Sequence, residues 1–396
     1  MSHRPIRDRA TLVSYAQITT WAWFLYAFGA VNALLRDEQG TTRTVSALHG
    51  TILAIGGLIG ALIASHLTRR WGRGLVVRWG ALVGVVGIAL FSWPHAGVVT
   101  TLSGIFIASL FAGGFMLVTV NAFVADHQGA AGPAALTEAN ASASMAGLIG
   151  PVIVGIGAAT FLSWRIGTIV TIVAFIATEV WRGPHLSDYA TLTKAAAASP
   201  HAPLPRKVYW AVAAVMCFVA AEFSMVLWSA DLLRERCGFG PAAAATALAV
   251  VTGGMFVGRL SGSWLAQRMN TETMLRSSIV IALIGFVLAW AFLWTPIVLI
   301  GLFTVGLGIS VHFPLGLARS LRASAGLTDR ASGRTSAGAS VGIAIAPFAL
   351  GAMADAIGFH TAFLLVPALL GTALVIVLLR PIPDAVSGPR LVMTLE

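Results

Sequence analysis

One carboxyl group stands near the middle of a long apolar segment of the sequence. Glu222 lies in the run Cys217-Phe-Val-Ala-Ala-Glu-Phe-Ser-Met-Val-Leu-Trp228, inside an apolar stretch that covers residues 208–233. At the helical rise, Glu222 would lie about 21 Å from the beginning of that stretch. Apolar surroundings disfavour the charged form of a carboxyl group, so Glu222 can bind and release a proton near neutral pH. Substrate binding and a structural hydrogen bond to a neighbouring helix are the alternative roles.

Two further polar side chains interrupt other apolar stretches. Arg259 lies in the stretch 241–265, about seven residues or roughly 10 Å from its end. Glu222 and Arg259 would therefore differ in depth by about 10 Å, and we expect no direct ion pair between them in one static state. We assign Arg259 a gating or structural role. His312, in the stretch 296–318, is a candidate second titrating group or proton relay, and a histidine hydrogen-bonded within the bundle is the alternative.

The composition indicates that these apolar segments lie within a membrane. The mean hydropathy is +0.86 and only 10% of the residues are charged, whereas about a quarter are charged in soluble domains. We predict an all-α integral membrane protein with twelve transmembrane helices. The apolar runs that are long enough to cross a bilayer, about 20 residues each, cover residues 14–35, 44–67, 75–93, 98–124, 137–161, 166–182, 208–233, 241–265, 275–294, 296–318, 335–355 and 360–380.

The net charge of +10 follows from how the basic residues are placed along the chain. If the N-terminus is cytoplasmic, 19 lysine and arginine residues fall in inner segments and five in outer segments. This asymmetry satisfies the positive-inside rule and places both termini in the cytoplasm. We therefore expect a multi-pass protein of the plasma membrane, in contact with membrane lipid, and no binding of nucleic acid.

A repeated fragment divides the chain into two halves. Residues 54–70 and 252–268 align at an offset of 198 residues, half of the 396-residue length, with shared glycines, leucines, a serine and a final arginine. Internal duplication of this kind predicts two pseudo-symmetric six-helix bundles that move against each other. The predicted organisation is an N-terminal bundle (1–182), a proline-containing cytoplasmic linker (183–207), a C-terminal bundle (208–380) and a cytoplasmic tail (381–396).

A second pair of matching segments lies in the fifth and eleventh runs. Gly150-Pro151 in the first half is matched by Ala346-Pro347 in the second, at an offset of 196 residues. Small residues spaced four apart let helices approach closely in lipid, and a proline in mid-span permits a bend. We therefore expect Gly150, Pro151 and Pro347 to take part in gating.

The segment Leu67-Thr68-Arg69-Arg70-Trp71-Gly72-Arg73 that follows the second run, together with the twelve runs in two halves, resembles the major facilitator superfamily of secondary transporters. The family pattern there is Gly-x-Leu-x-Asp-Arg-x-Gly-Arg. This chain has Ser65 at the glycine and Arg69 at the aspartate, and the second copy has Gln267 and Asn270 at the aspartate and the final glycine. The resemblance implies a cytoplasmic latch whose pairing is altered here. Its expected members are Arg70, Gly72, Arg73 and Arg268, with Asp126 or Glu179 as acidic partners.

The resemblance also implies which helices line the central cavity. In this superfamily they are spans one, four, seven and ten, and aromatic walls with few polar groups suit a small organic substrate. The candidate cavity residues are Trp23, Tyr26, Asn32, Asn121, Trp228 and Phe313. A packing or interfacial role is the alternative for each aromatic residue.

Glu138 and Arg334 occupy matching positions of the fifth and eleventh runs, 196 residues apart. If the pseudo-twofold axis brings the cytoplasmic ends of these runs together, the two side chains can form a salt bridge that breaks as the inside opens. We therefore predict a gating role for Glu138 and Arg334.

These features predict a proton-coupled secondary transporter, not an enzyme. We expect an exporter that exchanges a drug or metabolite for protons, with a proton-coupled importer of a sugar-like or other small metabolite as the alternative. The sequence contains no phosphate-cradling Gly-x-x-x-x-Gly-Lys loop of an ATP-driven pump. Cys217 and Cys237 lack the spacing of a metal site or a disulfide framework, so we expect no metal and no cofactor. The expected partners are the small-molecule substrate and the proton, bound by a monomer.

Overall fold

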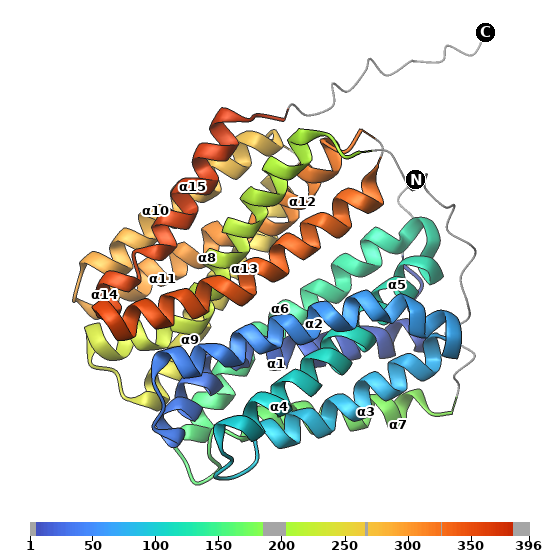
Figure 1. Ribbon diagram of the computed structural model, residues 1–396, viewed down its shortest axis with the longest axis horizontal. Coiled ribbons are helices and arrows are strands. Elements are labelled where there is room, and N and C mark those ends of the chain that lie inside the picture. Colours follow the sequence, from blue (N-terminus) through green and yellow to red (C-terminus); the bar gives the residue numbers. More distant parts are fainter. Residues whose placement is uncertain (1–4, 185–202, 266–267, 326, 383–396) are drawn as a thin grey trace.

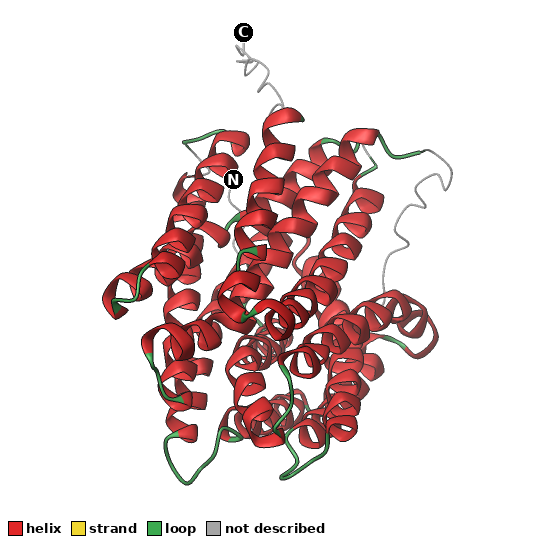
Figure 2. Cartoon of the chain, turned by 60° about the vertical axis from the view of Figure 1, so that its left-hand side comes forward, coloured by secondary structure: helices red, strands yellow, loops and turns green. Residues whose placement is uncertain are grey.

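The computed structural model describes residues 5–184, 203–265, 268–325 and 327–382. These residues form helices joined by short connections, and they contain no strand (Figure 2). The first half contains α1 (Arg9–Gln39), α2 (Arg43–Trp71), α3 (Arg73–Phe91), α4 (Val98–Ala108), η1 (Ser109–Met116), α5 (Leu117–Gln128), η2 (Gly129–Ala131), α6 (Gly132–Ala158) and α7 (Ile166–Arg182). The second half contains α8 (Arg206–Cys237), α9 (Pro241–Leu265), α10 (Thr271–Ala291), α11 (Thr295–Ile309), α12 (His312–Arg322), α13 (Thr328–Ile357), α14 (Phe359–Ala362) and α15 (Leu365–Leu379). The proposed linker 183–207 and tail 381–396 lie largely outside the described residues.

The helical spans agree with the apolar runs in number and position. Eleven segments of the described chain are long and apolar enough to cross a membrane. The twelfth predicted span corresponds to α7, which has 17 residues. The helices begin and end within about five residues of the apolar runs, except that α13 begins seven residues before its run, at Thr328. Asp8 and Asn270 cap the first turns of α1 and α10.

The two halves form two bundles that lie against each other along α1, α2, α6, α8, α9 and α13 (Figure 1). The repeated glycines perform the same packing in each bundle. A Cβ added at Gly56 would lie 2.9 Å from the Phe106 carbonyl oxygen, and one added at Gly254 would lie 2.1 Å from the Phe303 carbonyl oxygen. Both glycines therefore allow the second helix of a bundle to contact the backbone of its fourth helix, as expected for small residues in membrane helices.

The fourth span of each half departs from a regular α-helix at equivalent positions. In the first half the departure is the π-helical segment η1, between α4 and α5. In the second half the helix is interrupted at Ser310 and Val311, between α11 and α12. Interrupted helices at matching positions of two repeats are a feature of membrane transporters, and they lie close to binding sites in several folds.

The bundle has two ends, which differ in their contacts. We call the end where α1 begins and α15 ends the terminal face, and the opposite end the distal face. At the terminal face each half has an ion pair between the start of its third span and the end of its fourth. Arg73 pairs with Asp126 at 2.5 Å, and Glu272 pairs with Arg319 at 2.7 Å. The charges are reversed between the two halves, and neither pair joins one half to the other.

Candidate functional site

Glu222 lies on α8, at the boundary between the two bundles. Its side chain is part-buried, and it makes no hydrogen bond or ion pair to another described residue. The side chains that precede and follow it in α8, Ala221 and Phe223, pack into the apolar core. A part-buried carboxyl group at this depth, without a fixed partner among the described residues, can change its protonation state.

Arg259 on α9 reaches from the second half into the first. Its Nη1 atom donates hydrogen bonds to the Tyr26 hydroxyl at 3.0 Å and to the Ser144 hydroxyl at 2.9 Å. Tyr26 belongs to α1 and Ser144 to α6, so one guanidinium joins three helices across the boundary. Glu222 contributes an attractive electrostatic interaction with Arg259 but lies beyond ion-pair distance. Glu222 and Arg259 therefore form no direct ion pair in this structure, as expected from their difference in depth.

An apolar pocket lies beside these polar groups. It is lined by Leu25, Phe28, Gly29, Gly50, Leu53, Phe223, Val226, Leu227, Ile343 and Pro347, from α1, α2, α8 and α13. Leu25 and Phe223 are the chain neighbours of Tyr26 and Glu222, which places part of the pocket at the same height in the bundle as the polar groups. The lining carries no charged side chain, so the pocket suits an apolar group.

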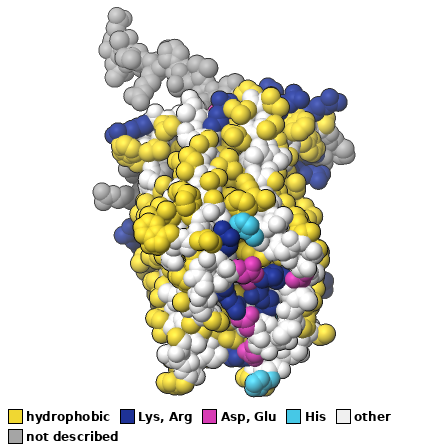
Figure 3. Space-filling view, turned by 90° about the vertical axis from the view of Figure 1, so that its left-hand side faces the viewer, with side chains coloured by type: hydrophobic (Ala, Val, Ile, Leu, Met, Phe, Trp, Pro, Cys, Tyr) yellow, Lys and Arg dark blue, Asp and Glu magenta, His cyan; other side chains and the backbone are white. Residues whose placement is uncertain are grey.

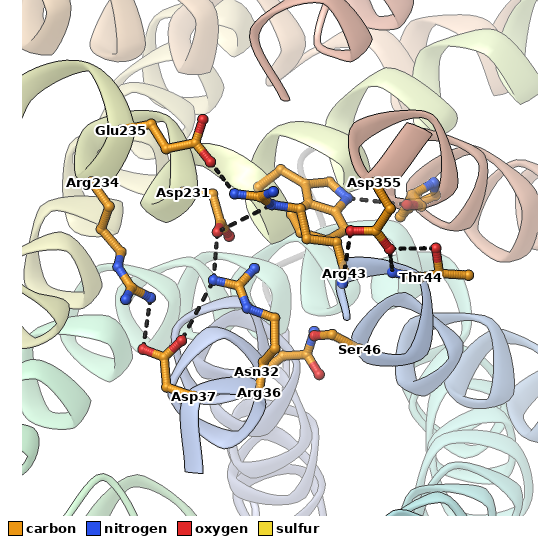
Figure 4. Close-up of polar contacts among 12 residues, drawn as sticks. Asn32, Arg36, Asp37, Arg43, Thr44, Ser46, Asp231, Arg234, Glu235 and Asp355 are labelled. Atoms are coloured by element: carbon orange, nitrogen blue, oxygen red, sulfur yellow. Dashed lines mark hydrogen bonds and ion pairs between the residues drawn. The ribbon is translucent and has the colours of Figure 1, made fainter. Parts of the chain in front are cut away.

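The distal face is closed by ion pairs that join the two halves (Figure 4). Arg36 of α1 pairs with Asp231 of α8 at 2.6 Å, and Arg234 of α8 pairs with Asp37 of α1 at 2.8 Å. Arg43 of α2 contacts Asp231 at 4.0 Å and also pairs with Glu235. Because Asp231 is 2% exposed, its interactions with the two arginines are shielded from water and from screening by salt.

Asp355 at the end of α13 adds a different contact to this closure. Its carboxylate accepts hydrogen bonds from the backbone N–H groups of Arg43 and Thr44 at 3.2 and 2.8 Å, and from the Thr44 hydroxyl at 2.6 Å. These N–H groups belong to the first turn of α2, where a carboxylate satisfies unpaired donors and the helix dipole. Acidic and basic side chains gather in one patch of this face (Figure 3). We call Arg36, Asp37, Arg43, Asp231, Arg234, Glu235 and Asp355 the distal network.

Helices of opposite halves also contact each other closely in the distal part of the bundle. A Cβ added at Gly29 of α1 would lie 2.3 Å from the Val226 carbonyl oxygen of α8. One added at Gly155 of α6 would lie 1.9 Å from the Thr246 hydroxyl of α9. Among the described residues, every ion pair that joins the two halves lies at the distal face. The structure is therefore closed at the distal face by packing and by charge.

The sequence profile of the Major Facilitator Superfamily matches residues 15–326. The chain belongs to this superfamily. Comparison with curated protein sequences found no match.

Solved structures with the same fold come from several transport systems. The nucleoside transporter NupG has 12% identity and a TM-score of 0.72, covering 94% of this chain and 98% of that chain. The E. coli fucose:proton symporter FucP has 19% identity and a TM-score of 0.60, covering 95% of this chain and 100% of that chain. A bacterial homologue of the human drug peptide transporters PepT1 and PepT2 has 12% identity and a TM-score of 0.73, covering 94% and 97%. At these identities the likeness establishes the shared fold of the superfamily.

The cavity residues predicted from the superfamily resemblance separate into two groups. Tyr26 lies at the boundary of the halves, bonded to Arg259. Trp23, Asn121 and Phe313 are part-buried, and the Trp23 indole N–H donates to the Gly167 carbonyl oxygen at 3.0 Å. For these four residues a contact with substrate remains a prediction.

Three predicted residues are packed inside the protein instead. Asn32 is buried and donates to the Ser46 hydroxyl at 2.8 Å. Trp228 is 1% exposed and donates its indole N–H to the Pro347 carbonyl oxygen at 3.1 Å. His312 is fully buried and stacks on Phe218 with ring centroids 4.6 Å apart. In this conformation all three side chains lie in helix–helix contacts. A substrate contact of Asn32 and Trp228, and a proton-relay role of His312, stay predictions.

The arginine-rich connection after α2 makes its ion pair within the first half, and its role as a latch stays a prediction. Arg73 is buried and paired with Asp126, one of its two expected acidic partners. Gly72 adopts a φ of +80°, a conformation that favours glycine, between α2 and α3. Arg70 is exposed. The second expected partner, Glu179, instead contacts Arg182 and Arg78 in the same half.

The remaining gating residues belong to the terminal face or to the boundary between the halves. Arg268 stacks on Trp264, with its guanidinium carbon 3.8 Å from the ring centroid. Glu138 pairs with Arg7 at 3.0 Å, whereas Arg334 is exposed. The predicted Glu138–Arg334 bridge is absent from this conformation, and its formation in another state stays a prediction. Gly150, Pro151 and Pro347 lie buried inside α6 and α13.

Sequence reasoning did not identify Ser144 or the distal network. Ser144 was one of several small residues in a Gly/Ala/Ser-rich run. Asp231, Arg234 and Glu235 lie at the end of the apolar run 208–233 or just beyond it. A signal was present, since Arg36-Asp37 and Asp231-x-x-Arg234-Glu235 place opposite charges at the outer ends of the first and seventh spans. Their pairing depends on how the two halves meet.

Proposed function

We propose that this superfamily member is a proton-coupled secondary active transporter that moves a small organic molecule by alternating access. The proposal rests on one observation, the unpartnered carboxyl group of Glu222 at the boundary between the halves. The proton is carried by Glu222 and the substrate occupies the space beside it. In its main form the proposal is export, in which a drug or metabolite leaves in exchange for protons.

A group that carries a proton must be reachable and must change its surroundings between states. Glu222 is part-buried at the boundary of the bundles, so relative movement of the halves changes its exposure. When Glu222 is ionised, the positive charge of Arg259 stabilises it from the neighbouring helix. Movement of the halves that separates Glu222 from Arg259 removes that attraction and favours protonation of Glu222, which couples proton binding to the conformational change.

The positions of the basic residues give the direction of opening. The 19 basic residues of the predicted inner segments place the terminal face in the cytoplasm. With the distal network closed, the described conformation is then the one that faces the cytoplasm. Transport requires the distal network to open while the terminal face closes, with the predicted Glu138–Arg334 bridge as one contact of that second state.

Two kinds of coupling agree with this arrangement. Export is favoured by Gly150-Pro151 in α6, which resembles a pattern of drug/proton antiporters and lies where α6 meets α1. The alternative is a proton-coupled importer of a sugar-like or other small metabolite, favoured by the similarity to a fucose:proton symporter. The direction of the driving proton gradient separates the two mechanisms.

The decisive measurement is flux into proteoliposomes that hold the purified full-length chain. A panel of nucleosides, sugars, dipeptides, organic acids and lipophilic drugs is offered under an imposed pH gradient of either sign. Accumulation driven by an acidic lumen identifies exchange for protons, and accumulation driven by an acidic exterior identifies co-transport. Glu222→Gln is expected to abolish gradient-driven accumulation while leaving exchange of substrate across the membrane measurable.

Glu38→Gln is the matched control, because Glu38 is bound to Arg165 and Trp164 within the first half, at the distal face. It should retain gradient-driven flux. Undiminished gradient-driven accumulation by Glu222→Gln would remove Glu222 from coupling. Flux in the wild type that ignores the pH gradient would disprove proton coupling itself.

A further inference from the structure

Arg259 has an unusual set of partners for a charged residue at this depth. Its two hydrogen bonds go to neutral hydroxyl groups, those of Tyr26 and Ser144. No carboxylate of the described residues lies within ion-pair distance of it. Charged groups within a membrane are normally paired with an opposite charge, because an uncompensated charge costs several kcal/mol. The site therefore holds a positive charge whose full counter-ion is supplied from elsewhere.

The unused donors of Arg259 are open to such a counter-ion. Both hydrogen bonds start from Nη1, which leaves Nε and Nη2 without a partner. The side chain is part-buried, and neither atom is among the buried donors that lack a partner. Nε and Nη2 form the edge of the guanidinium that binds a carboxylate through two parallel hydrogen bonds. The geometry thus suits a planar two-oxygen anion.

The apolar pocket defines the rest of the ligand. Its lining residues Leu25 and Phe223 are the chain neighbours of Tyr26 and Glu222, so the pocket and the polar groups share one level of the bundle. No charged side chain lines it. A ligand that uses both parts has one anionic group and an apolar body. The pocket encloses about 20 Å³ in this conformation, so it must widen to admit an apolar body.

We infer that the substrate of this transporter is an organic carboxylate, whose carboxylate binds Arg259 and whose apolar part occupies the pocket lined by Leu25, Phe28, Phe223 and Ile343. This inference rests on the proposed transport function and names the substrate class of the same site. The bound carboxylate replaces the long-range attraction between Arg259 and Glu222 with a direct ion pair. It thereby favours protonation of Glu222, so a carboxylate and a proton bind together, as the co-transport form of the proposed function requires.

A binding experiment without any gradient tests the inference. Benzoate, phenylacetate and 4-methylpentanoate are titrated into the detergent-solubilised full-length chain, beside their primary amides, with calorimetry and thermal melting as readouts. The carboxylates are expected to bind saturably and to raise the melting temperature, whereas the amides of the same shape do neither. Arg259→Gln is expected to weaken carboxylate binding about tenfold or more, because it removes a charge-assisted pair.

Two further variants keep the result interpretable. Arg259→Lys retains the charge and loses the two-pronged geometry, so it should bind carboxylates with intermediate affinity even if Arg259→Gln folds poorly. Arg276→Gln is the matched control, since Arg276 lies in the second turn of α10, which packs on α11, α12 and α15 in the second half. This variant should bind the carboxylates as the wild type does.

Several results would overturn the substrate assignment. These are equal binding of carboxylates and amides, wild-type affinity in both Arg259 variants, and no binding of any of the three carboxylates. Tighter binding of phenyl phosphate than of benzoate would replace the carboxylate with a different anion. A different result would disprove proton coupling and leave the substrate assignment intact. In that case carboxylates would bind through Arg259, but their flux would not depend on the pH gradient.

Discussion

At the level of single residues, burial separates the polar side chains that can function from those that hold helices together. Glu222 and Arg259 are part-buried at the boundary of the halves, and Arg259 has only hydroxyl partners. Trp228, although close to Glu222 in sequence, is inside the contact between α8 and α13. Their positions along α8 place Glu222 and Trp228 at similar depths in the membrane. Only the direction of each side chain shows that the two residues have different surroundings.

Trp228→Phe tests the structural role of this indole. The substitution keeps an aromatic ring but removes the donor to the Pro347 carbonyl oxygen, so we expect a stability loss of about 1–3 kcal/mol. The thermal melting temperature in detergent should fall, while the KM for transported substrate stays at the wild-type value. Trp294→Phe serves as the control, because Trp294 is largely exposed at the distal face. A raised KM with unchanged melting would return Trp228 to the substrate cavity.

At the level of helices, the sequence predicted positions well and irregularities poorly. Hydropathy locates α7 and α9 to the residue, because Gly183-Pro184 follows the first of these runs and Gly240-Pro241 opens the second. The π-helical segment η1 and the break at Ser310 and Val311 were missed. Both lie inside continuous apolar runs, where a change in backbone hydrogen bonding leaves hydropathy unaltered. Clustered glycines, such as Gly113 and Gly114, were the available signal.

The contact between α6 and α9 gives a prediction about how tightly the halves close. Gly155 allows α6 to lie against Thr246, and a methyl group at position 155 would overlap the Thr246 hydroxyl and approach the Ala242 carbonyl oxygen at 2.8 Å. Gly155→Ala should therefore separate the helices on the distal side and slow transport several-fold. Gly253→Ala in the same helix pair is the control, since its added methyl group would meet only Leu148, at an ordinary 3.5 Å.

Proteoliposome flux and the thermal melting temperature are measured for both glycine variants. Gly155→Ala should lower both quantities, and Gly253→Ala should leave both near their wild-type values. Equal effects of the two substitutions would show that close approach at Gly155 is unimportant for transport. The two variants test the separation of α6 and α9, because each adds only a methyl group and no polar or charged atom.

At the level of the whole molecule, the two halves are duplicates whose contacts differ between the two faces. The repeat predicts that Gly56 and Gly254 make the same type of close helix contact, since duplicated small residues indicate duplicated helix contacts. The contacts that join the two halves could not be predicted from the repeat. The residues that meet across the boundary are far apart in sequence and are not related by the repeat. Arg43 and Asp355, which are 312 residues apart, meet only in the folded protein.

The distal network should set the balance between the two open states. Asp231→Asn leaves Arg36 and Arg43 near a neutral amide in a buried site, and loss of one partner of a buried ion pair costs about 3–5 kcal/mol. That cost falls on the closed distal face, since opening exposes both arginines to water. A change of this size shifts a two-state population by more than about a hundredfold. We therefore expect Asp231→Asn to populate a conformation that is open at the distal face.

Distances between spin labels at Phe161→Cys and Leu293→Cys measure this opening, in a chain whose two native cysteines are replaced by alanine. Phe161 and Leu293 are exposed at the distal face of opposite halves, so their separation increases only when the halves part. The parent chain should give one short distance, and Asp231→Asn should add a longer one. Glu38→Gln breaks an ion pair with Arg165 inside the first half and should keep the short distance alone. An unchanged distance distribution in Asp231→Asn would mean that helix packing, without the ion pairs, holds the distal face closed.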